Sequence, residues 1–171
     1  MSDQQLKVPP PPPEIRRRIT FYPVQLIGVS LLALIPILAL LGVFGETFTD
    51  TSAGSSSFQL DVHYPERYRY KMLNSLVVTI HNTSSQPFDE VLVSFDSDYI
   101  DKFSTVVFTP SVEKITSEVH LIRLEDFEPG AVQIVNVELQ GERYGLHSGF
   151  IRVEAENAEP AEVTVSTLIF P

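Results

Sequence analysis

The chain has 171 residues, enough for one domain of ordinary size plus a short appendage and too few for two full domains with a membrane span. Its 12 Lys and Arg against 22 Asp and Glu give a formal charge of -10, which argues against a general nucleic-acid binder. No cysteine is present, so thiol nucleophiles, disulfide frameworks and cysteine-ligated metal clusters are excluded.

Residues 1–20 are proline-rich and basic. Pro9 to Pro13 form an uninterrupted run, which favours polyproline II and can serve either as a stiff spacer or as a ligand for an aromatic groove. The arginines of this tail directly precede an apolar segment, where their charges can hold anionic lipid headgroups. These predicted membrane contacts are Arg16, Arg17 and Arg18.

The apolar segment that follows is long enough to cross a membrane. Between Val24 and Phe44, 21 residues include only two distinctly polar side chains, Gln25 and Ser30. As a helix this run rises about 31 Å, close to the ~30 Å hydrocarbon thickness of a bilayer. A signal peptide usually has a shorter apolar region followed by a small-x-small cleavage site, a pattern that is missing here. We therefore predict a transmembrane helix within residues 21–45.

Prolines and small residues give this predicted helix its shape. Pro23 occupies the first turn, where its missing N–H costs no hydrogen bond. Pro36 lies in the middle and is expected to kink the helix. With the small residues Gly28, Ser30 and Ala33, the kink would let a second membrane helix approach closely. The alternative is that membrane helices simply tolerate proline.

The charges that flank the segment predict its orientation. Three arginines precede it, whereas no Lys or Arg follows it until Arg67. Because positive charge is retained on the cytoplasmic side, residues 1–20 are expected in the cytoplasm and residues 46–171 outside.

The remainder of the chain has the pattern of a β-protein. Residues 46–57 are rich in Ser, Thr and Gly and are expected to be a linker. Residues 58–171 contain seven segments with apolar side chains at alternate positions, separated by Asn, Gly and Pro turn signals. These segments begin at Phe58, Leu76, Val91, Val119, Val132, Phe150 and Val163. The predicted fold class is all-β, a seven-strand antiparallel Ig-like β-sandwich preceded by one transmembrane α-helix.

Three features of residues 58–171 resemble a known family. A strand from Leu76 ends in an Asn-Thr turn at Asn82, a Pro-Gly turn closes at Gly130 before a Val-rich strand, and the glycine-flanked Tyr144 precedes a late strand. The pattern is similar to the CARDB-type adhesion domains, which are Ig-like extracytoplasmic modules of bacteria. The resemblance implies a bacterial cytoplasmic membrane protein with a periplasmic or extracellular domain that binds or spaces, with no catalytic residues to transfer.

The residues offer little for catalysis or metal binding. The four histidines are scattered singly, without the spacing that brings two ligands to one metal from one element. Asp96, Asp98 and Asp101 could supply oxygen ligands to Ca²⁺. The alternative is that Asp96 or Ser97 caps a short helical turn. We expect no cofactor, no small-molecule substrate and no enzymatic activity.

One segment combines cations with aromatic side chains. In an extended chain Arg67 and Arg69 lie on one face, and Tyr68 and Tyr70 on the other. Nucleic acid is not expected here because the domain is acidic and extracytoplasmic. The tyrosines are expected to pack on the sandwich, and the cations to meet headgroups or an acidic partner.

Two functions fit these observations. The first is a non-enzymatic accessory subunit of a larger integral membrane complex of respiratory or photosynthetic type. Its helix would dock within the bilayer and its sandwich would brace the outer face. The second is a stand-alone surface receptor, adhesin or envelope sensor that binds a soluble or wall ligand.

Overall fold

A computed structural model describes residues 22–42 and 45–171 of the chain. The chain divides into two compact units, with the boundary between Val43 and Phe44. The predictions made for residues 1–20, including the proline run and the three arginines, lie outside the described residues.

In residues 22–42, the described part of the N-terminal unit, there is one helix, α1 (Pro23–Leu40), with Pro23 at its first turn as predicted. The backbone N–H of Tyr22 donates to the side-chain oxygen of Gln25 at 3.3 Å, so a polar residue of the apolar segment is used at the helix start. The helix continues through Pro36, which has no N–H to donate to the preceding turn. None of its residues is buried, and by length and composition it could cross a membrane or act as a signal sequence.

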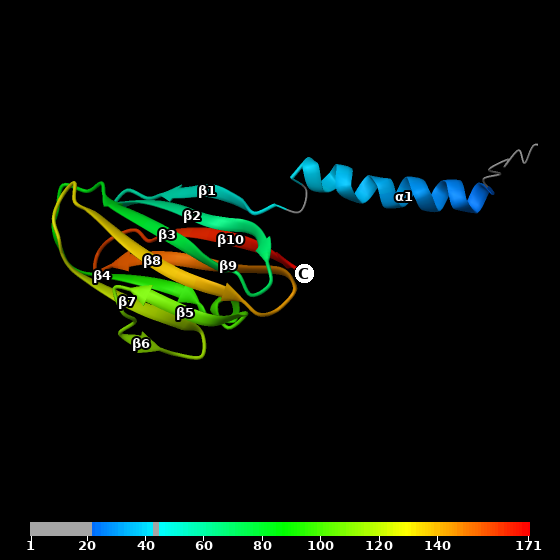
Figure 1. The fold of residues 1–171 in the computed structure, drawn as a ribbon. Coiled ribbons are helices and arrows are strands. Elements are labelled where there is room, and N and C mark those ends of the chain that lie inside the picture. The colour runs from blue at the N-terminus through cyan, green and yellow to red at the C-terminus, as the bar shows by residue number, and fades with distance from the viewer. Residues whose placement is uncertain (1–21, 43–44) are drawn as a thin grey trace, which may run out of the picture. The chain divides into compact units, whose positions relative to one another are not determined.

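The second unit is a β-domain with ten strands and one short helix in its described residues (Figure 1). In chain order its elements are β1 (Thr47–Gly54), β2 (Phe58–Arg69), β3 (Leu73–Asn82), β4 (Phe88–Asp96), α2 (Ser97–Ile100), β5 (Phe103–Thr109), β6 (Lys114–Ile115), β7 (Val119–Phe127), β8 (Val132–Gly141), β9 (Gly145–Ala155) and β10 (Ala161–Phe170).

These strands form one curled sheet. Their order is β5-β8-β3-β2-β10-β9-β4-β7-β6, and β1 pairs with β2. The two halves of the sheet join where β2 and β10 run parallel for three residue pairs, from Arg67 opposite Leu168 to Arg69 opposite Phe170. All the other pairings are antiparallel.

The curl encloses a single apolar core between the two halves of the sheet. The ring of Phe58 on β2 lies 6.4 Å from that of Phe127 on β7, and Phe95 on β4 lies 5.3 Å from Phe108 on β5. In each pair the two strands belong to different halves of the sheet, so both inner faces share one interior. The core extends along the strands through fully buried aliphatic residues, among them Leu60, Leu76, Val78, Ile80, Val93, Ile122, Val135, Leu139, Ile151 and Val165.

The predicted β class is confirmed, but the seven-strand sandwich is wrong. All seven predicted strands exist, and three more were missed: β1, β5 and β6. The linker prediction for residues 46–57 is corrected as well, because β1 begins at Thr47 and pairs along eight residues with β2. Its sequence is polar because an edge strand needs backbone hydrogen bonds and little apolar cover. Local composition therefore resembles that of a linker.

The turn positions were predicted more accurately than the strand number. Asn82 ends β3, and the Glu128–Gly130 signal lies between β7 and β8. In β10 burial alternates along the whole strand, but an inward position is occupied by the polar Thr167, which is buried, and the apolar Leu168 points outward and is 38% exposed.

Candidate functional site

One end of the β-domain brings together segments that are far apart in the sequence. The backbone N–H of Tyr70 donates to the carbonyl of Phe170 at 2.8 Å, and that of Lys71 donates to the carbonyl of Gly141 at 2.9 Å. Thr47, the first residue of β1, pairs with Arg67 at the same place. The β2–β3 turn, the β8–β9 turn, the C-terminal end of β10 and the start of β1 therefore meet.

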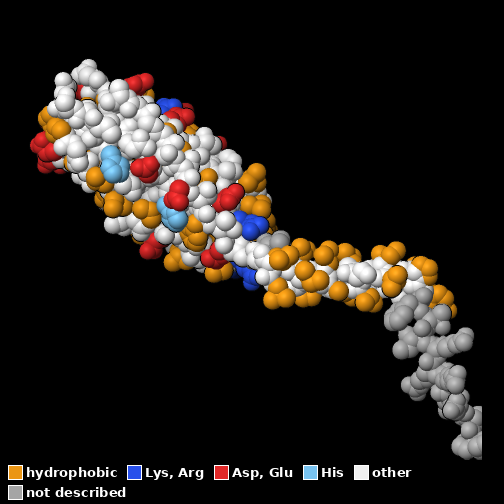
Figure 2. Space-filling view, turned by 90° about the horizontal axis from the view of Figure 1, so that it is seen from above, with side chains coloured by type: hydrophobic (Ala, Val, Ile, Leu, Met, Phe, Trp, Pro, Cys, Tyr) orange, Lys and Arg blue, Asp and Glu red, His pale blue; other side chains and the backbone are white. Residues whose placement is uncertain are grey.

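Most of the domain's cations lie at this end. Residues 45–171 contain eight Lys and Arg, and five of them lie in or beside these converging segments. We call this surface the cationic end and define it by Arg67, Arg69, Lys71, Lys102 and Arg143. Lys102 joins it through its carbonyl, which accepts a hydrogen bond from the N–H of Glu142 at 3.3 Å. Figure 2 shows Lys and Arg atoms at one end of the β-domain, and a further group of them beside Asp and Glu atoms at the upper margin of that face.

The cations are interleaved with exposed apolar side chains. Leu146 is 67% exposed, and Leu73 and Tyr144 are each 55% exposed. Phe48, Met72 and Leu168 are also more than one third exposed. The rings of Tyr70 and Tyr144 lie 4.7 Å apart, and the Nζ of Lys71 lies 5.4 Å from the Tyr70 ring. Cations and apolar side chains therefore form one mixed surface.

Lys71 has an unusual backbone conformation for its residue type. Its φ is 60°, in the left-handed region that favours glycine, and a non-glycine residue there costs about 1 kcal/mol. The turn nevertheless carries an exposed lysine. Strain of this kind is retained where the side chain has a use.

Arg67 lines a hollow at this end. Its Nη2 donates to Thr47 Oγ1 at 3.1 Å, whereas its buried Nε has no hydrogen-bond partner within the described residues. The hollow has a volume of about 390 Å³. It is lined by Thr47, Tyr64, Glu66, Arg67, Leu146, Ser166 and Leu168. A guanidinium beside leucine side chains is suited to an anionic group attached to an apolar body.

The four residues predicted to alternate in this segment do so only in part. Tyr68 is fully buried and Tyr70 is half-buried, as expected, and Arg69 is exposed. Arg67 is half-buried, because a register shift between Thr47 and Phe48 places β1 beside it.

Two buried tyrosines beneath the surface differ in their hydrogen bonding. Burial raises the pKa of Tyr68 and of Tyr99 above the usual phenol range, so both are protonated at neutral pH. The hydroxyl of Tyr99 lies 2.9 Å from Thr167 Oγ1, which in turn donates to the carbonyl of Pro65 at 2.9 Å. The hydroxyl of Tyr68 has no partner among the described residues.

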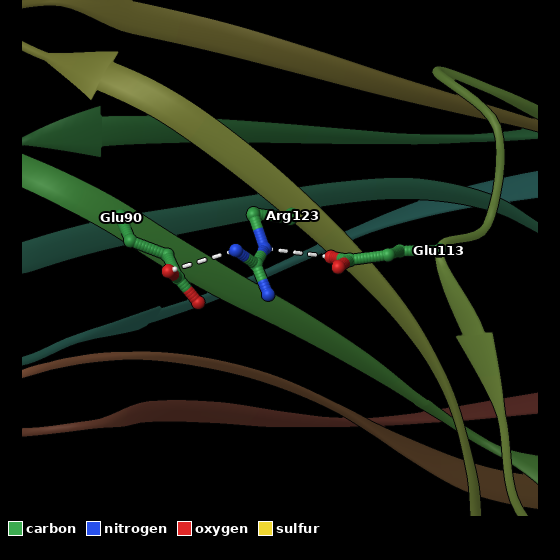
Figure 3. A network of polar contacts seen from close by, with 3 residues as sticks. All are labelled: Glu90, Glu113 and Arg123. Carbon is green, nitrogen blue, oxygen red and sulfur yellow. Dashed lines mark hydrogen bonds and ion pairs between the residues drawn. The ribbon is translucent and has the colours of Figure 1, made fainter.

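The opposite end of the β-domain holds the β3–β4, β7–β8 and β9–β10 turns and is acidic, and the arginines between the two ends are paired. Arg123 lies between two carboxylates, with Nε 2.7 Å from Glu113 and Nη1 3.2 Å from Glu90 (Figure 3). The hydrogen bond that Arg123 donates to Glu113 raises the pKa of Arg123. Arg152 likewise donates to Glu162 at 2.7 Å. Among the described residues, no ion pair involves a side chain of the cationic end.

The acidic segment after β4 is a helix cap. Asp96 is the N-cap of α2, and its carboxylate accepts from the N–H of Asp98 at 2.9 Å. Within the described residues, no three acidic or histidine side chains lie close enough to share a metal ion, so Asp96, Asp98 and Asp101 are not brought together as Ca²⁺ ligands.

The small residues of α1 do not form one face. At about 100° per residue, Ser30 and Ala33 lie about 60° apart, and Pro36 continues their stripe. Gly28 lies about 160° from Ser30, on the other side of the helix. An ideal Cβ built on Gly28 would meet no atom within 4 Å, so that side is also open.

Sequence reasoning missed Lys102, Arg143 and Leu146 as members of this surface. Each lies near a strand end, but the sequence does not reveal which strand ends are neighbours. The available signal was the Arg143-Tyr144 pair after the Gly141 turn, which repeats the Arg-Tyr alternation of β2.

No family model matches the chain, and no curated protein matches its sequence. Among solved structures, it is similar to BslA, a bacterial hydrophobin, with a TM-score of 0.38 and 13% identity over 74% of this chain and 92% of that one. AvmM, described as catalysing macrocyclization in alchivemycin A biosynthesis, gives a TM-score of 0.38 and 9% identity over 72% and 90% of the two chains. A mutant β-glucosidase from Listeria innocua gives 0.36 and 13%, and this chain spans 16% of its length. Likenesses at these scores carry no inference about activity.

Proposed function

We propose that the chain is a single-pass, non-enzymatic accessory subunit of a larger integral membrane complex. The observation that carries this proposal is the bare apolar surface of α1: its 18 residues contain no charge and none of them is buried. In water, such a surface would be an aggregation liability. In a bilayer it is the ordinary exterior of a spanning helix.

The orientation rests on the flanking charges. Arg16, Arg17 and Arg18 place the N-terminus in the cytoplasm, and the β-domain then lies outside a bacterial cytoplasmic membrane. The resemblance to CARDB-type adhesion modules supports the same location. No cofactor or small-molecule substrate forms part of this proposal.

The partner is proposed to be another membrane helix. The stripe of Ser30, Ala33 and Pro36 has small side chains and one backbone carbonyl, that of Leu32, without its usual amide donor. Membrane helices associate through close packing at small residues and through polar groups that a neighbour can satisfy. The β-domain would add interface area on the outer face, and the anchor would keep its effective concentration high there.

Mild-detergent purification of the tagged full chain tests the proposal. A stoichiometric set of integral membrane subunits is expected to co-purify. Pro36→Leu should reduce their recovery several-fold while the β-domain stays folded, and Ile35→Leu, on the opposite face of α1, should leave it unchanged. A chain that purifies alone would contradict the proposal and favour a stand-alone receptor. A chain cleaved near residue 46 and freely soluble would show that α1 is a signal sequence.

A further inference from the structure

We propose that the cationic end is a docking surface for the anionic phospholipid headgroups of the membrane that anchors the chain, which rests on the proposed membrane span of α1. The chain that connects α1 to β1 is short. Thr47 is seven residues after Leu40, and a chain of that length spans at most about 25 Å. If α1 is in the bilayer, β1 starts within that distance of the hydrocarbon.

The residues around the start of β1, where the connection from α1 ends, have the composition of a membrane interface. Thr47 pairs with Arg67, so the start of β1 is part of the cationic end. Lys and Arg are attracted to anionic headgroups, and tyrosine and exposed leucine side chains suit the boundary between headgroup and acyl chain. The hollow lined by Arg67 combines the same two chemistries, a guanidinium and the side chains of Leu146 and Leu168.

The charge of the cationic end is complementary to that of an anionic bilayer. Residues 45–171 contain 8 Lys and Arg against 20 Asp and Glu, so an anionic bilayer repels the domain as a whole. Arg123 and Arg152, between the two ends, are paired with carboxylates, whereas the cationic end has five cations without an ion pair in the described residues. An anionic surface therefore favours a single orientation, with the cationic end toward the lipid.

The absence of cysteine makes this orientation measurable in the full chain. Met72→Cys, at the cationic end, and Ser85→Cys, in the β3–β4 turn at the other end, each provide one attachment point for a spin label. The labelled chains are reconstituted into nanodiscs of phosphatidylcholine alone or of equal parts phosphatidylcholine and phosphatidylglycerol. The accessibility of each label to oxygen and to a water-soluble nickel complex is then measured.

In anionic discs the label at residue 72 should be shielded from the nickel complex, and the label at residue 85 should remain accessible. In neutral discs both should be accessible. The variant R69Q/K71Q/R143Q removes three cations, and at about fivefold per charge its docked-to-free ratio should fall about a hundredfold. The matched variant K114Q/R123Q/R152Q removes three cations elsewhere and should dock as the unmodified chain does. High salt should release docking.

Equal accessibility at residue 72 in both lipids would overturn the proposal, as would equal losses from the two triple variants. Shielding at residue 72 in native membranes but not in anionic discs would also overturn it and would point to a protein partner. Flotation of the same discs distinguishes a failure of docking from a failure of the proposed membrane span of α1. A chain that stays with neutral discs at alkaline pH retains its anchor even if docking fails, and a chain that stays with neither disc has lost both.

Discussion

The two ends of the β-domain are held together in different ways. At the acidic end, Asn82 is 2% exposed and its amide donates to three carbonyls, those of Gln86, Phe127 and Glu128, at 2.9 to 3.1 Å. Its oxygen accepts from the N–H and the hydroxyl of Ser84. One side chain thus joins the β3–β4 and β7–β8 turns through satisfied hydrogen bonds.

The cationic end relies on packing instead. Tyr68 is fully buried, its ring is 6.5 Å from that of Phe103, and its hydroxyl has no partner among the described residues. Lys71 has a strained backbone conformation. Left-handed backbone occurs at both ends, since Asp126 and Asn157 at the acidic end have φ values of 54° and 60°. The comparison teaches that one end is joined by satisfied hydrogen bonds, and that the other tolerates unsatisfied polar groups beneath a charged surface. Such compromises are typical of surfaces retained for binding.

The largest expected effect is at the acidic end. Asn82→Ala leaves the carbonyl groups of two turns without their donor, so we expect a loss of about 3 kcal/mol in the free energy of unfolding. Urea denaturation of the full chain in detergent measures it. Asn82→Asp is the informative companion, because its carboxylate keeps the acceptor and loses the donor. A loss below about 1 kcal/mol for the alanine variant would contradict the assigned role of Asn82 in joining the two turns.

A pair of glycine substitutions compares packing at the two ends. A Cβ on Gly141 would lie 3.1 Å from both Tyr68 and Ile169, so Gly141→Ala should cost about 2 kcal/mol by overpacking. Gly130, near Asn82, has open space but a φ of 75°, and Gly130→Ala should cost about 1 kcal/mol by backbone strain. Thermal denaturation checks both. A larger loss of stability for Gly130→Ala than for Gly141→Ala would show that the cationic end is packed less tightly than the acidic end.

A substitution of Lys71 should separate stability from docking. Lys71→Gly relieves the left-handed strain and should stabilise the folded chain by about 1 kcal/mol. The same variant should dock less well on anionic discs, since one cation is lost. Lys71→Asn, whose side chain tolerates the left-handed region, is the matched control for the backbone effect. If Lys71→Gly destabilises the folded chain, the backbone strain at residue 71 is not retained for the sake of the lysine side chain.

The tyrosine hydroxyls provide a smaller contrast. Tyr99→Phe removes the hydrogen bond to Thr167 and should cost about 1 kcal/mol. Tyr68→Phe removes a hydroxyl with no partner in the described structure and should be neutral or slightly stabilising. Equal losses in the two variants would mean that the Tyr68 hydroxyl is hydrogen-bonded after all.

The raised phenol pKa values make stability depend on pH only in alkali. In the unfolded chain these tyrosines lose their protons near pH 10, whereas burial raises the pKa of Tyr68 and Tyr99 in the folded chain. Above about pH 10 the unfolded state therefore binds fewer protons, and stability falls as pH rises. Unfolding midpoints between neutral and strongly alkaline pH should fall less steeply for Tyr68→Phe. Parallel curves would contradict the burial effect.

Local pattern alone determined much of this protein. The charge-free run predicted α1 with Pro23 at its first turn, and alternating apolar residues predicted seven of the strands. The segment after β4 offered Asp96 or Ser97 as the cap of a short helical turn, and Asp96 is the cap of α2. These features are set by neighbours within a few residues, through helix-end chemistry and the two-residue period of a strand.

Only the tertiary structure decided which segments meet. β1 has the composition of a linker and becomes a strand because the edge of β2 offers it hydrogen bonds. The short parallel pairing of β2 with β10 joins the two halves of a curled sheet, where the sequence predicted a seven-strand sandwich. The same junction brings Arg67 and Lys71, at the end of β2 and in the turn after it, together with Arg143 of the β8–β9 turn. Register between distant strands depends on burial and backbone pairing across the whole domain, and no local period records it.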